Sequence, residues 1–328
     1  METRVNIAII GCGYIGEKRA RTLGEHELIV ACDLDLNKAL KIGKMVDYNI
    51  HVTNDWKQAI DIVKVELVII STTNDCLVPI ALYAVEKGKH ILIEKPAARS
   101  AKELKGLMDV VERKNIKAKV GFNLRYHPAL IKAKEIIGLK FMGELMFIRG
   151  RYGHGGRVGY EKEWRFNPEI SGGGELIDQG VHLIDLARWF LGEFSKVEGS
   201  LHTYFWDIKE DDNSFLNLQT KDGKIAWLHA SCTEWKNMFS LEIYGKMGKI
   251  QIDGLGGSYG IETLTYYQMT EKMGKPKQNS WIFDKDDSWQ KEFDNFIRLI
   301  EDDQPVLNES LNDAYEALKI VDKLYENE

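Results

Sequence analysis

Residues 7–16 read IAIIGCGYIG, an apolar run that leads directly into a glycine-rich turn. The run predicts a β-strand, and the residues after Gly16 predict a helix. A second apolar stretch, residues 28–32, ends on Asp33, about 20 residues beyond Gly13. A G-x-G-x-x-G turn between a strand and a helix, with an acidic residue at this distance, is typical of a dinucleotide-binding domain.

Each glycine of the turn has a physical role in such a domain. Gly11 permits the tight turn, Gly13 lets the backbone approach a pyrophosphate, and Gly16 lets the helix pack closely on the strand. The helix N-terminus offers free N–H groups and a positive dipole end to the phosphates. We predict that the cofactor is contacted by Gly11, Gly13, Tyr14, Ile15, Gly16, Asp33, Thr72, Asn74, Glu94 and Lys95.

Asp33 favours NAD over NADP. A carboxylate at the end of this strand accepts hydrogen bonds from the ribose hydroxyls and repels a 2′-phosphate. Leu34 adds no positive charge, although Arg19, Arg21 and Lys38 lie near in the sequence. We therefore predict NAD as the cofactor.

The composition is that of an ordinary globular protein. The 328 residues are 44% hydrophobic and 29% charged, and the length allows two domains. The net charge of −6 argues against nucleic acid as a partner, and no apolar run is long enough to span a membrane. The N-terminus lacks a signal-peptide segment, so we expect a cytoplasmic protein. The four cysteines show no C-x-x-C spacing and are expected to be reduced and structural.

The first 122 residues alternate between strand and helix patterns. Strands are predicted over 5–10, 27–32, 66–71, 90–93 and 117–122, and helices over 15–24, 36–46, 56–63, 77–87 and 101–114. Alternating β and α units imply a parallel sheet with helices on both faces. We expect residues 1–122 to form an NAD-binding, doubly wound (Rossmann) domain.

The pattern changes after residue 122. Helices are predicted over 128–137, 175–191, 288–301 and 310–326, and strands over 144–152, 196–206, 213–221, 224–233, 238–244, 248–253 and 261–269. Consecutive strands with tight turns imply a large, mostly antiparallel sheet with helices on one face. The fold class is thus α/β, with an α+β substrate-binding domain over residues 123–328.

Lys95 follows the strand predicted over 90–93, within the segment Glu94-Lys95-Pro96. Ligands of such sheets bind beyond the carboxyl ends of the strands, and Pro96 keeps Lys95 in an extended conformation. We expect the ammonium group to lie near the nicotinamide. A solvated loop lysine is the alternative.

The helix predicted over 175–191 carries a narrow polar stripe. Asp178 and His182 are four residues apart, Asp185 continues the stripe, and nearly every other residue is apolar. This pattern indicates a lined cavity, and a purely structural hydrogen-bonded pair is the alternative. The glycines of Gly172-Gly-Gly174, which precede the helix, would permit close approach by a ligand.

These residue types suit oxidation of a secondary alcohol. NAD takes the hydride, and a histidine is suited to take the proton near neutral pH. In our hypothesis His182 transfers the proton, Lys95 hydrogen-bonds the reacting oxygen, and Asp178 orients one or both. A metal ion is not expected, because a divalent cation would face the ammonium of Lys95.

Arginine and aromatic residues alternate on a glycine-rich stretch between residues 149 and 166. This pattern suits a phosphate or carboxylate beside a sugar face or a base, which would indicate a nucleotide-linked or otherwise anionic sugar. Salt bridges within or between subunits are the alternative. The predicted substrate contacts are Lys95, Arg125, Tyr152, Arg157, Trp164, Arg165, Asp178 and His182.

Taken together, the chain resembles the Gfo/Idh/MocA oxidoreductases. The resemblance covers the fingerprint, Glu94-Lys95-Pro96, residues 121–128, Gly172–Gly174 and the segment from Asp178 to Trp189. It implies that Lys95, Asp178 and His182 are the catalytic trio and that the bond before Pro96 is often cis. It further implies a sugar or polyol substrate, and an open sheet whose outer face mediates a homodimer or homotetramer.

One position departs from the family pattern. Many members carry a histidine where this chain has Leu77, so any polar contact made there is absent. Two other functions remain open on this fold: an NAD-using glycosidase that oxidises the sugar transiently, and a non-catalytic NAD or sugar sensor. Retention of the trio argues against the sensor, and the match over residues 172–189 favours an ordinary dehydrogenase.

Overall fold

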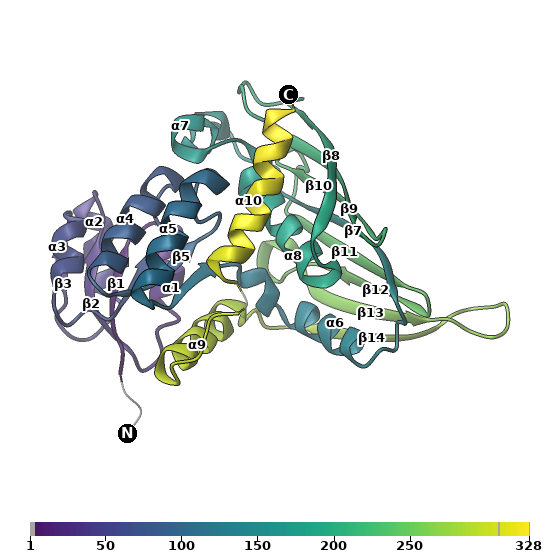
Figure 1. Ribbon diagram of the computed structural model, residues 1–328, viewed down its shortest axis with the longest axis horizontal. Helices are drawn as coiled ribbons and strands as arrows, with labels where there is room; N and C mark the ends of the chain where they lie inside the picture. The colour runs from purple at the N-terminus through teal and green to yellow at the C-terminus, as the bar shows by residue number, and fades with distance from the viewer. Residues whose placement is uncertain (1–3, 308, 328) are drawn as a thin grey trace. The chain divides into compact units, whose positions relative to one another are not determined.

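The computed structural model describes residues 4–307 and 309–327 (Figure 1). Their contacts divide the chain into two compact units. The first unit runs from the start of the described chain to Phe122 and includes Glu169–Gly172 and Trp289–Leu318. The second unit comprises Asn123–Pro168, Gly173–Ser288 and residues 319–327. Three boundaries between the units fall inside helices, namely α7 (Pro168–Ser171), α9 (Ser288–Glu301) and α10 (Leu311–Glu326).

The first unit contains a six-stranded parallel sheet in the order β3-β2-β1-β4-β5-β6. Its strands are β1 (Asn6–Ile10), β2 (Glu27–Cys32), β3 (His51–Thr53), β4 (Leu67–Ile70), β5 (His90–Glu94) and β6 (Ala118–Gly121). The helices between them are α1 (Tyr14–Ala20), α2 (Leu36–Gly43), α3 (Trp56–Asp61), α4 (Asn74–Glu86) and α5 (Ala101–Lys114). This strand order confirms the predicted doubly wound fold.

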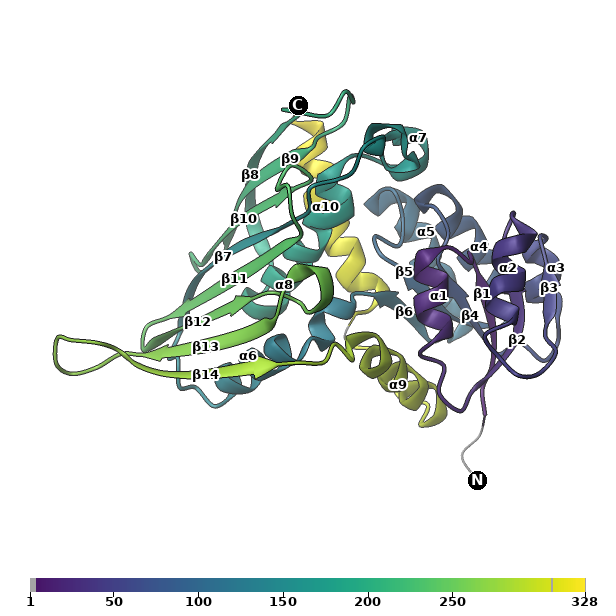
Figure 2. The same ribbon diagram turned by 180° about the vertical axis from the view of Figure 1, so that it is seen from behind.

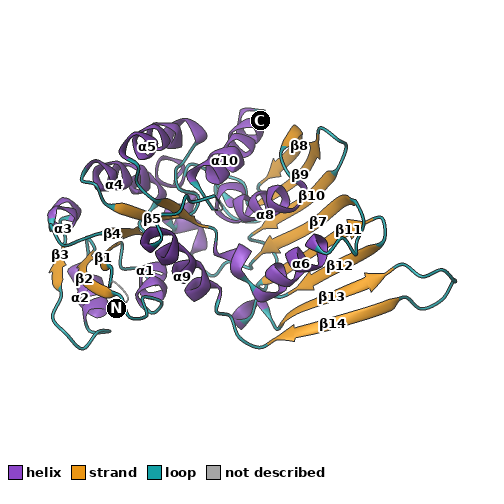
Figure 3. Cartoon of the chain, turned by 60° about the horizontal axis from the view of Figure 1, so that its bottom comes forward, coloured by secondary structure: helices purple, strands orange, loops and turns teal. Residues whose placement is uncertain are grey.

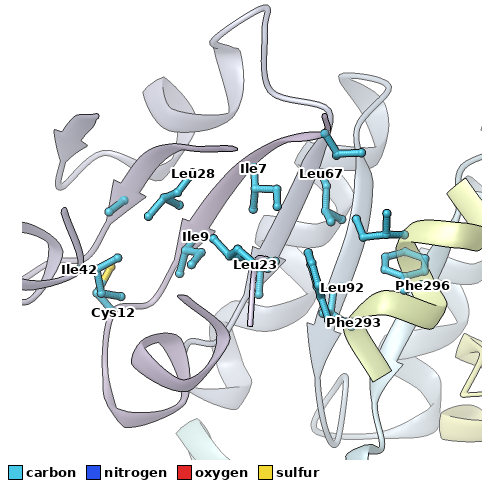
Figure 4. Close-up of a cluster of buried hydrophobic side chains, with 14 of the residues drawn as sticks. Ile7, Ile9, Cys12, Leu23, Leu28, Ile42, Leu67, Leu92, Phe293 and Phe296 are labelled. Atoms are coloured by element: carbon cyan, nitrogen blue, oxygen red, sulfur yellow. The ribbon is translucent and has the colours of Figure 1, made fainter. Parts of the chain in front are cut away.

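A late helix completes the core of this unit. Helix α9 (Ser288–Glu301) contributes Phe293 and Phe296, both fully buried, to the same apolar cluster as Leu67 and Leu92 of the sheet (Figure 4). The hydrophobic periodicity predicts the helix but gives no indication of the sheet on which it packs. The nucleotide-binding core is therefore built from both ends of the chain.

The second unit contains an eight-stranded sheet in the order β14-β13-β12-β11-β7-β10-β9-β8 (Figure 3). All neighbouring strands are antiparallel except β7 and β10, which are parallel. The strands are β7 (Leu145–Gly153), β8 (Phe194–His202), β9 (Asn213–Thr220), β10 (Ile225–Ser231), β11 (Met238–Gly245), β12 (Gly248–Asp253), β13 (Glu262–Gln268) and β14 (Lys277–Phe283). The predicted large, mostly antiparallel sheet is confirmed.

Within the described part of the chain, helices cover one face of this sheet and leave the other open (Figure 1 and Figure 2). Helix α8 (Val181–Leu191) packs against β7 and β10, and α6 (Pro128–Gly138) packs against β12, β13 and β14. Figure 1 shows both helices in front of the sheet, and Figure 2 shows the same sheet from its open face. Along β11, the side chains of Leu241 and Ile243 are buried and those of Glu242 and Tyr244 are partly exposed, as expected for a half-covered sheet.

None of the described helices combines the length and the apolar character that crossing a bilayer requires.

Candidate active site

The glycine-rich turn has the geometry that the fingerprint predicts. Gly11 has φ +90°, and a Cβ at this position would lie 2.5 Å from the carbonyl carbon of Ser71. A Cβ on Gly16 would lie 2.1 Å from the carbonyl oxygen of Gly11, so only glycine lets α1 begin so close to β1. A Cβ on Gly13 would meet no atom of the described residues within 4 Å. The backbone at Gly13 is thus open to a pyrophosphate at the N-terminus of α1.

Asp33 lies directly after β2 and is fixed beside this turn. Its carboxylate accepts hydrogen bonds from the backbone N–H of Cys12, at 2.7 Å, and of Asp35, at 2.9 Å. Leu34 is 87% exposed and carries no charge. Asp33 is thus held beside the glycine-rich turn, and its contact with an adenosine ribose stays a prediction.

The other predicted cofactor residues of the first unit have different surroundings. Tyr14 is largely exposed, and Ile15 and Thr72 are partly buried. Asn74 is buried, and its side-chain amide donates a hydrogen bond of 2.8 Å to the carbonyl oxygen of Ser171. The amide nitrogen of Asn74 therefore ties the segment Glu169–Gly172 to this unit.

The segment that carries Lys95 rests on a buried ion network. The guanidinium of Arg19, on α1, donates from Nε to Glu94 at 2.6 Å and also pairs with Glu292 of α9. Burial raises the pKa of Glu292 to about 7, even though Arg19 opposes the shift. The carboxylate of Glu94, a predicted cofactor contact, is thus engaged by Arg19. The Lys95–Pro96 peptide bond is cis, as the resemblance implied.

The helix that carries Asp178 and His182 does not begin as a regular α-helix. Residues Leu176–Gly180 form a π-helical turn, and α8 continues from Val181. Such turns are frequent at functional sites. Asp178 lies in the π-helical turn, and His182 lies in the first turn of α8. The four-residue spacing predicted that Asp178 and His182 lie on one face of an α-helix. Because a π-helical turn holds Asp178, the two side chains follow that α-helical spacing only approximately.

Asp211 anchors the start of this helix. Its carboxylate accepts hydrogen bonds from the backbone N–H of Leu176, at 2.7 Å, and from the hydroxyl of Tyr325, at 3.0 Å. Burial raises the pKa of Asp211 to about 6. A Cβ on Gly173 would lie 2.2 Å from the hydroxyl of Tyr325, and one on Gly174 would lie 2.2 Å from the carbonyl oxygen of Asp211. These two glycines thus make room for Tyr325 and Asp211 of the same chain, whereas the sequence suggested the close approach of a ligand.

His182 is buried, with 5% of its surface exposed, and its ring contacts the ring of Tyr152 edge-on at 5.9 Å. Tyr152 projects from β7 towards the helices. Burial, reinforced by Tyr259 and the charge of Asp178, raises the pKa of Tyr152 well above its usual value. The phenol therefore stays protonated near neutral pH and can donate a hydrogen bond, but it cannot act as a base.

The arginines of the loop after β7 have carboxylate partners. Arg165 donates from Nε to Asp178 at 3.1 Å and from Nη1 to Glu163 at 3.0 Å. Arg157, which is mostly exposed, also pairs with Glu163. The guanidinium of Arg165 lies 4.9 Å from the ring centroid of Trp164. Both arginines are therefore largely neutralised by their own loop and by Asp178.

Arg125 and Asp185 form a separate buried pair. The guanidinium of Arg125 donates two hydrogen bonds, of 2.8 Å and 2.5 Å, to the two carboxylate oxygens of Asp185. Both side chains are almost fully buried. The pair joins the segment before α6 to α8, so the guanidinium of Arg125 is already engaged by a carboxylate of its own chain.

The second unit thus brings Tyr152, Asp178, His182 and Arg165 into one cluster. Lys95 belongs to the first unit, so its convergence with His182 stays a prediction. Sequence reasoning missed Glu163, which lies two residues before Arg165 but carries no motif, and Asp211, which contacts the start of the helix that carries Asp178 only through the fold. In the part of the chain that the structure describes, no three His, Cys, Asp or Glu side chains are grouped to hold a metal ion.

The first unit has the fold of a Rossmann-type dinucleotide-binding domain, and the second contains an open, mostly antiparallel sheet. A family model described as an oxidoreductase family with an NAD-binding Rossmann fold matches residues 5–122, and one described as a GFO/IDH/MocA C-terminal domain matches residues 130–251. The chain belongs to the GFO/IDH/MocA family of oxidoreductases. Its first unit is an NAD-binding Rossmann domain.

Among curated relatives, a levoglucosan dehydrogenase of Pseudarthrobacter phenanthrenivorans is 34% identical over 215 residues, which are 61% of this chain and 54% of that enzyme. The chain thus matches about half the length of that relative. A D-glucoside 3-dehydrogenase of Escherichia coli is 25% identical over 69% of this chain and 70% of its own length. A solved levoglucosan dehydrogenase, in complex with NADH and levoglucosan, has a TM-score of 0.89 and 25% identity, and the match covers 99% of this chain and 96% of that one.

Proposed function

We propose that this protein is an NAD-dependent dehydrogenase that transfers a hydride between nicotinamide and a secondary alcohol or ketone of a sugar. One observation carries the proposal: the buried rings of His182 and Tyr152, with the half-buried Asp178 beside them, in a chain that belongs to an NAD-binding oxidoreductase family. NAD, when bound, accepts the hydride. The side chains must then move the proton and hold the alcohol.

His182 takes the alcohol proton in this proposal. Tyr152, whose ring contacts that of His182, cannot accept this proton, because burial raises its pKa and keeps the phenol protonated. Asp178 orients the imidazole, and the hydrogen bond from Arg165 holds Asp178 in place. Lys95, from the first unit, donates a hydrogen bond to the reacting oxygen and stabilises the developing negative charge.

The substrate that we propose is a neutral sugar. The cations expected to recognise a phosphate or carboxylate, Arg157 and Arg165, are already paired with Glu163 and Asp178. An anionic sugar would have to displace these carboxylates. The names of two relatives, levoglucosan dehydrogenase and D-glucoside 3-dehydrogenase, support a neutral sugar as well.

NAD is the proposed cofactor rather than NADP. The support is the fixed carboxylate of Asp33 together with the uncharged, exposed Leu34. Replacement of Asp33 by serine together with Leu34→Arg is expected to shift the ratio of kcat/KM towards NADP, and wild-type preference for NADP would contradict the assignment.

Replacement of His182 by alanine tests the function. A panel of levoglucosan, free sugars, glycosides, myo-inositol and nucleotide sugars is first screened for NADH formation. With the sugar that is oxidised, His182→Ala is expected to lower kcat by about 10²–10⁴-fold and to leave NAD binding nearly intact. His51→Ala, at an exposed histidine of β3, is the control. A near wild-type rate for His182→Ala would contradict the assignment, and aglycone release without net NADH would identify the NAD-using glycosidase instead.

We further propose that the open face of the eight-stranded sheet mediates a homodimer or homotetramer. A hollow of about 410 Å³ lies on this face, lined by residues that include Arg149, Trp227, His229 and Glu242. Trp227 is 59% exposed there, and an exposed tryptophan beside charged groups is typical of a contact surface. Light scattering coupled to gel filtration tests this: Trp227→Glu is expected to lower the molar mass, and a monomeric wild type would contradict it.

A further inference from the structure

The loops at one end of the eight-stranded sheet lie close together. In the last row of this sheet, Gly153 pairs with Ser231 and Met238, and Asn213 pairs with Ser231 and His202. The loops that leave the sheet at this row are 154–168, 203–212 and 232–237. Tyr152, the ring neighbour of His182, immediately precedes the same row. The candidate active site and these three loops therefore share one end of the sheet.

A series of aromatic rings leads outward from the site along these loops. Tyr160, whose hydroxyl lies 3.2 Å from Nε2 of His154, contacts the ring of Trp206 at 5.6 Å between centroids. Trp206 contacts Phe205 at 5.0 Å, and Phe205 contacts Trp235 at 4.6 Å. We call Phe205, Trp206 and Trp235 the aromatic platform.

Tyr160 connects the aromatic platform to the reacting residues. Tyr160 is buried, and Arg165, five residues further along the same loop, donates a hydrogen bond to Asp178 at 3.1 Å. Tyr160 also contacts Phe166, beside Arg165, at 5.0 Å between ring centroids. A ligand that reached Asp178 would therefore find Tyr160 and then the platform beside it.

The outer part of the platform is exposed, although exposure of such rings is unfavourable. Phe205 is 58% exposed and Trp235 is 64% exposed. Trp235 also has φ +54°, a left-handed conformation that costs free energy for a bulky residue. Burial of the ring does not offset this cost in the isolated chain. Strain of this kind is typical of residues that have a binding role.

The chain holds the platform in a fixed conformation. Asp212, fully buried, accepts hydrogen bonds from the backbone N–H of Tyr204, Phe205 and Trp206, at 2.9, 2.8 and 3.1 Å. The indole N–H of Trp206 donates to the carbonyl oxygen of Cys232 at 3.0 Å. The segment that carries Phe205 and Trp206 is therefore preorganised, which lowers the entropic cost of binding a ligand on these rings.

Gly156 allows the platform to lie against the loop of the active site. A Cβ on Gly156 would lie 2.3 Å from the ring of Trp206. A Cβ on Gly155 would lie 2.7 Å from the Cα of Trp235. The glycines of residues 154–168 thus bring the platform and the loop of Tyr160 into direct contact.

We propose that the aromatic platform is a subsite for the second ring of a disaccharide, whose first ring is oxidised beside His182. The inference rests on the proposed function and extends its substrate class. The C–H face of a pyranose is apolar and carries slightly positive hydrogens, so it stacks on the negative face of an aromatic ring. The hydroxyl edge of the same sugar ring would meet water and the exposed polar residues Asp207 and Lys209 of the platform loop.

Two variants test the subsite. Trp235→Gly removes the ring and relieves the strained backbone, because glycine adopts a positive φ without steric cost. Phe205→Ala removes the neighbouring ring. Both are expected to raise KM for the preferred disaccharide among cellobiose, maltose and trehalose roughly tenfold, and to leave kcat and KM for glucose within about twofold. Trp235→Gly is expected at the same time to keep the melting temperature at or above that of the wild type.

The control lies in the same loop. Tyr204 is 66% exposed and stacks on His202 at 4.9 Å, outside the ring series of the platform. Tyr204→Ala should leave KM for the disaccharide unchanged. Trp235→Phe, which keeps an aromatic face, should restore most of the loss seen with Trp235→Gly, and Trp235→Leu should not.

Titration calorimetry of the NAD-loaded protein with the same disaccharides separates this subsite from the proposed function. Absence of NADH formation from every sugar of the panel counts against the proposed function. Weaker disaccharide binding by Trp235→Gly still supports the subsite in that case. The subsite would be overturned if the variants bound glucose and the disaccharide with the same loss of affinity, or lost affinity for neither. It would also be overturned if the wild type preferred 4-nitrophenyl glucoside alone, or if the variants changed in molar mass.

Discussion

Replacement of Arg19 by methionine is expected to destabilise the NAD-binding unit severely. Arg19 is fully buried and pairs with Glu94 and Glu292 at once, while its guanidinium lies 4.5 Å from the ring centroid of Trp289. Methionine fills much of the volume but leaves the two carboxylates buried without a cation.

The expected loss is about 3–5 kcal/mol, the usual cost of removing one partner from a buried ion pair. A domain of ordinary stability has only about 5–15 kcal/mol in total. The variant should therefore unfold at much lower urea concentration, and intrinsic tryptophan fluorescence, to which Trp289 contributes, should report the transition. Because Glu94 precedes Lys95, NAD binding and kcat should fall as well.

Two further proteins control this experiment. Arg21→Met, at an exposed arginine two residues on, should change the unfolding free energy by less than about 0.5 kcal/mol. Combining Arg19→Met with Glu94→Gln and Glu292→Gln removes the unpaired charges and should regain at least half of the lost stability. A loss below about 1 kcal/mol for Arg19→Met alone would refute the argument that the buried carboxylates depend on this cation.

Three other changes give distinct outcomes. Burial raises the folded-state pKa of Glu292 from 4.5 to about 7, so the unfolding free energy should fall as the pH rises from 4.5 to 7, by at most about 1.4 kcal/mol per pH unit. In urea unfolding, Glu292→Gln should lack this decline. Identical pH profiles for the variant and the wild type would contradict the raised pKa. Gly11 has φ +90°, and an alanine Cβ would lie 2.5 Å from Ser71, so Gly11→Ala should lower the unfolding free energy by about 1–3 kcal/mol. The variant should also bind NAD at least tenfold more weakly in a fluorescence titration. Unchanged affinity would argue against the turn as the cofactor site. Gly150→Val should lower the unfolding free energy by about 1–3 kcal/mol in calorimetry, because even a Cβ at this position would lie 3.2 Å from Leu183 on α8. An unchanged unfolding free energy would show that α8 can shift away from β7.

The sequence was sufficient to predict the parallel sheet because its signals are local. Strands such as β4 are apolar throughout and buried on both faces, so each stands out from the amphipathic helices around it. The short β3 was missed because only Thr53 is buried among its three residues. The edge strand β14 was missed for a similar reason: its residues are mostly exposed and show no apolar alternation.

The candidate site was predictable only where a motif or a spacing carried it. Asp178 and His182 were proposed as site residues because a polar pair stands out on an apolar helix. The role of Asp211 depends on contacts with Leu176 and Tyr325, which are far from it in the sequence, so no local pattern could indicate it. Long-range pairs of this kind follow from the tertiary fold.

The loop arginines show the same limit. Arg157 and Arg165 next to aromatic residues suggested an anionic ligand, and the loop itself supplies Glu163 as their partner. A carboxylate a few residues away can be recognised in the sequence, but whether it pairs with a given arginine depends on the conformation of the loop. Arg125 is a clearer case, because its partner Asp185 is 60 residues distant.

The position of α9 in the nucleotide-binding core has a consequence for synthesis in the cell. Residues 1–122 leave the ribosome long before Phe293 and Phe296, which cover the apolar surface around Leu67 and Leu92. At the usual speed of translation this interval is about 10–30 s. During that time the nascent chain exposes an unfinished hydrophobic surface, so it should depend on chaperones, and a stop codon placed before α9 should yield an aggregating product.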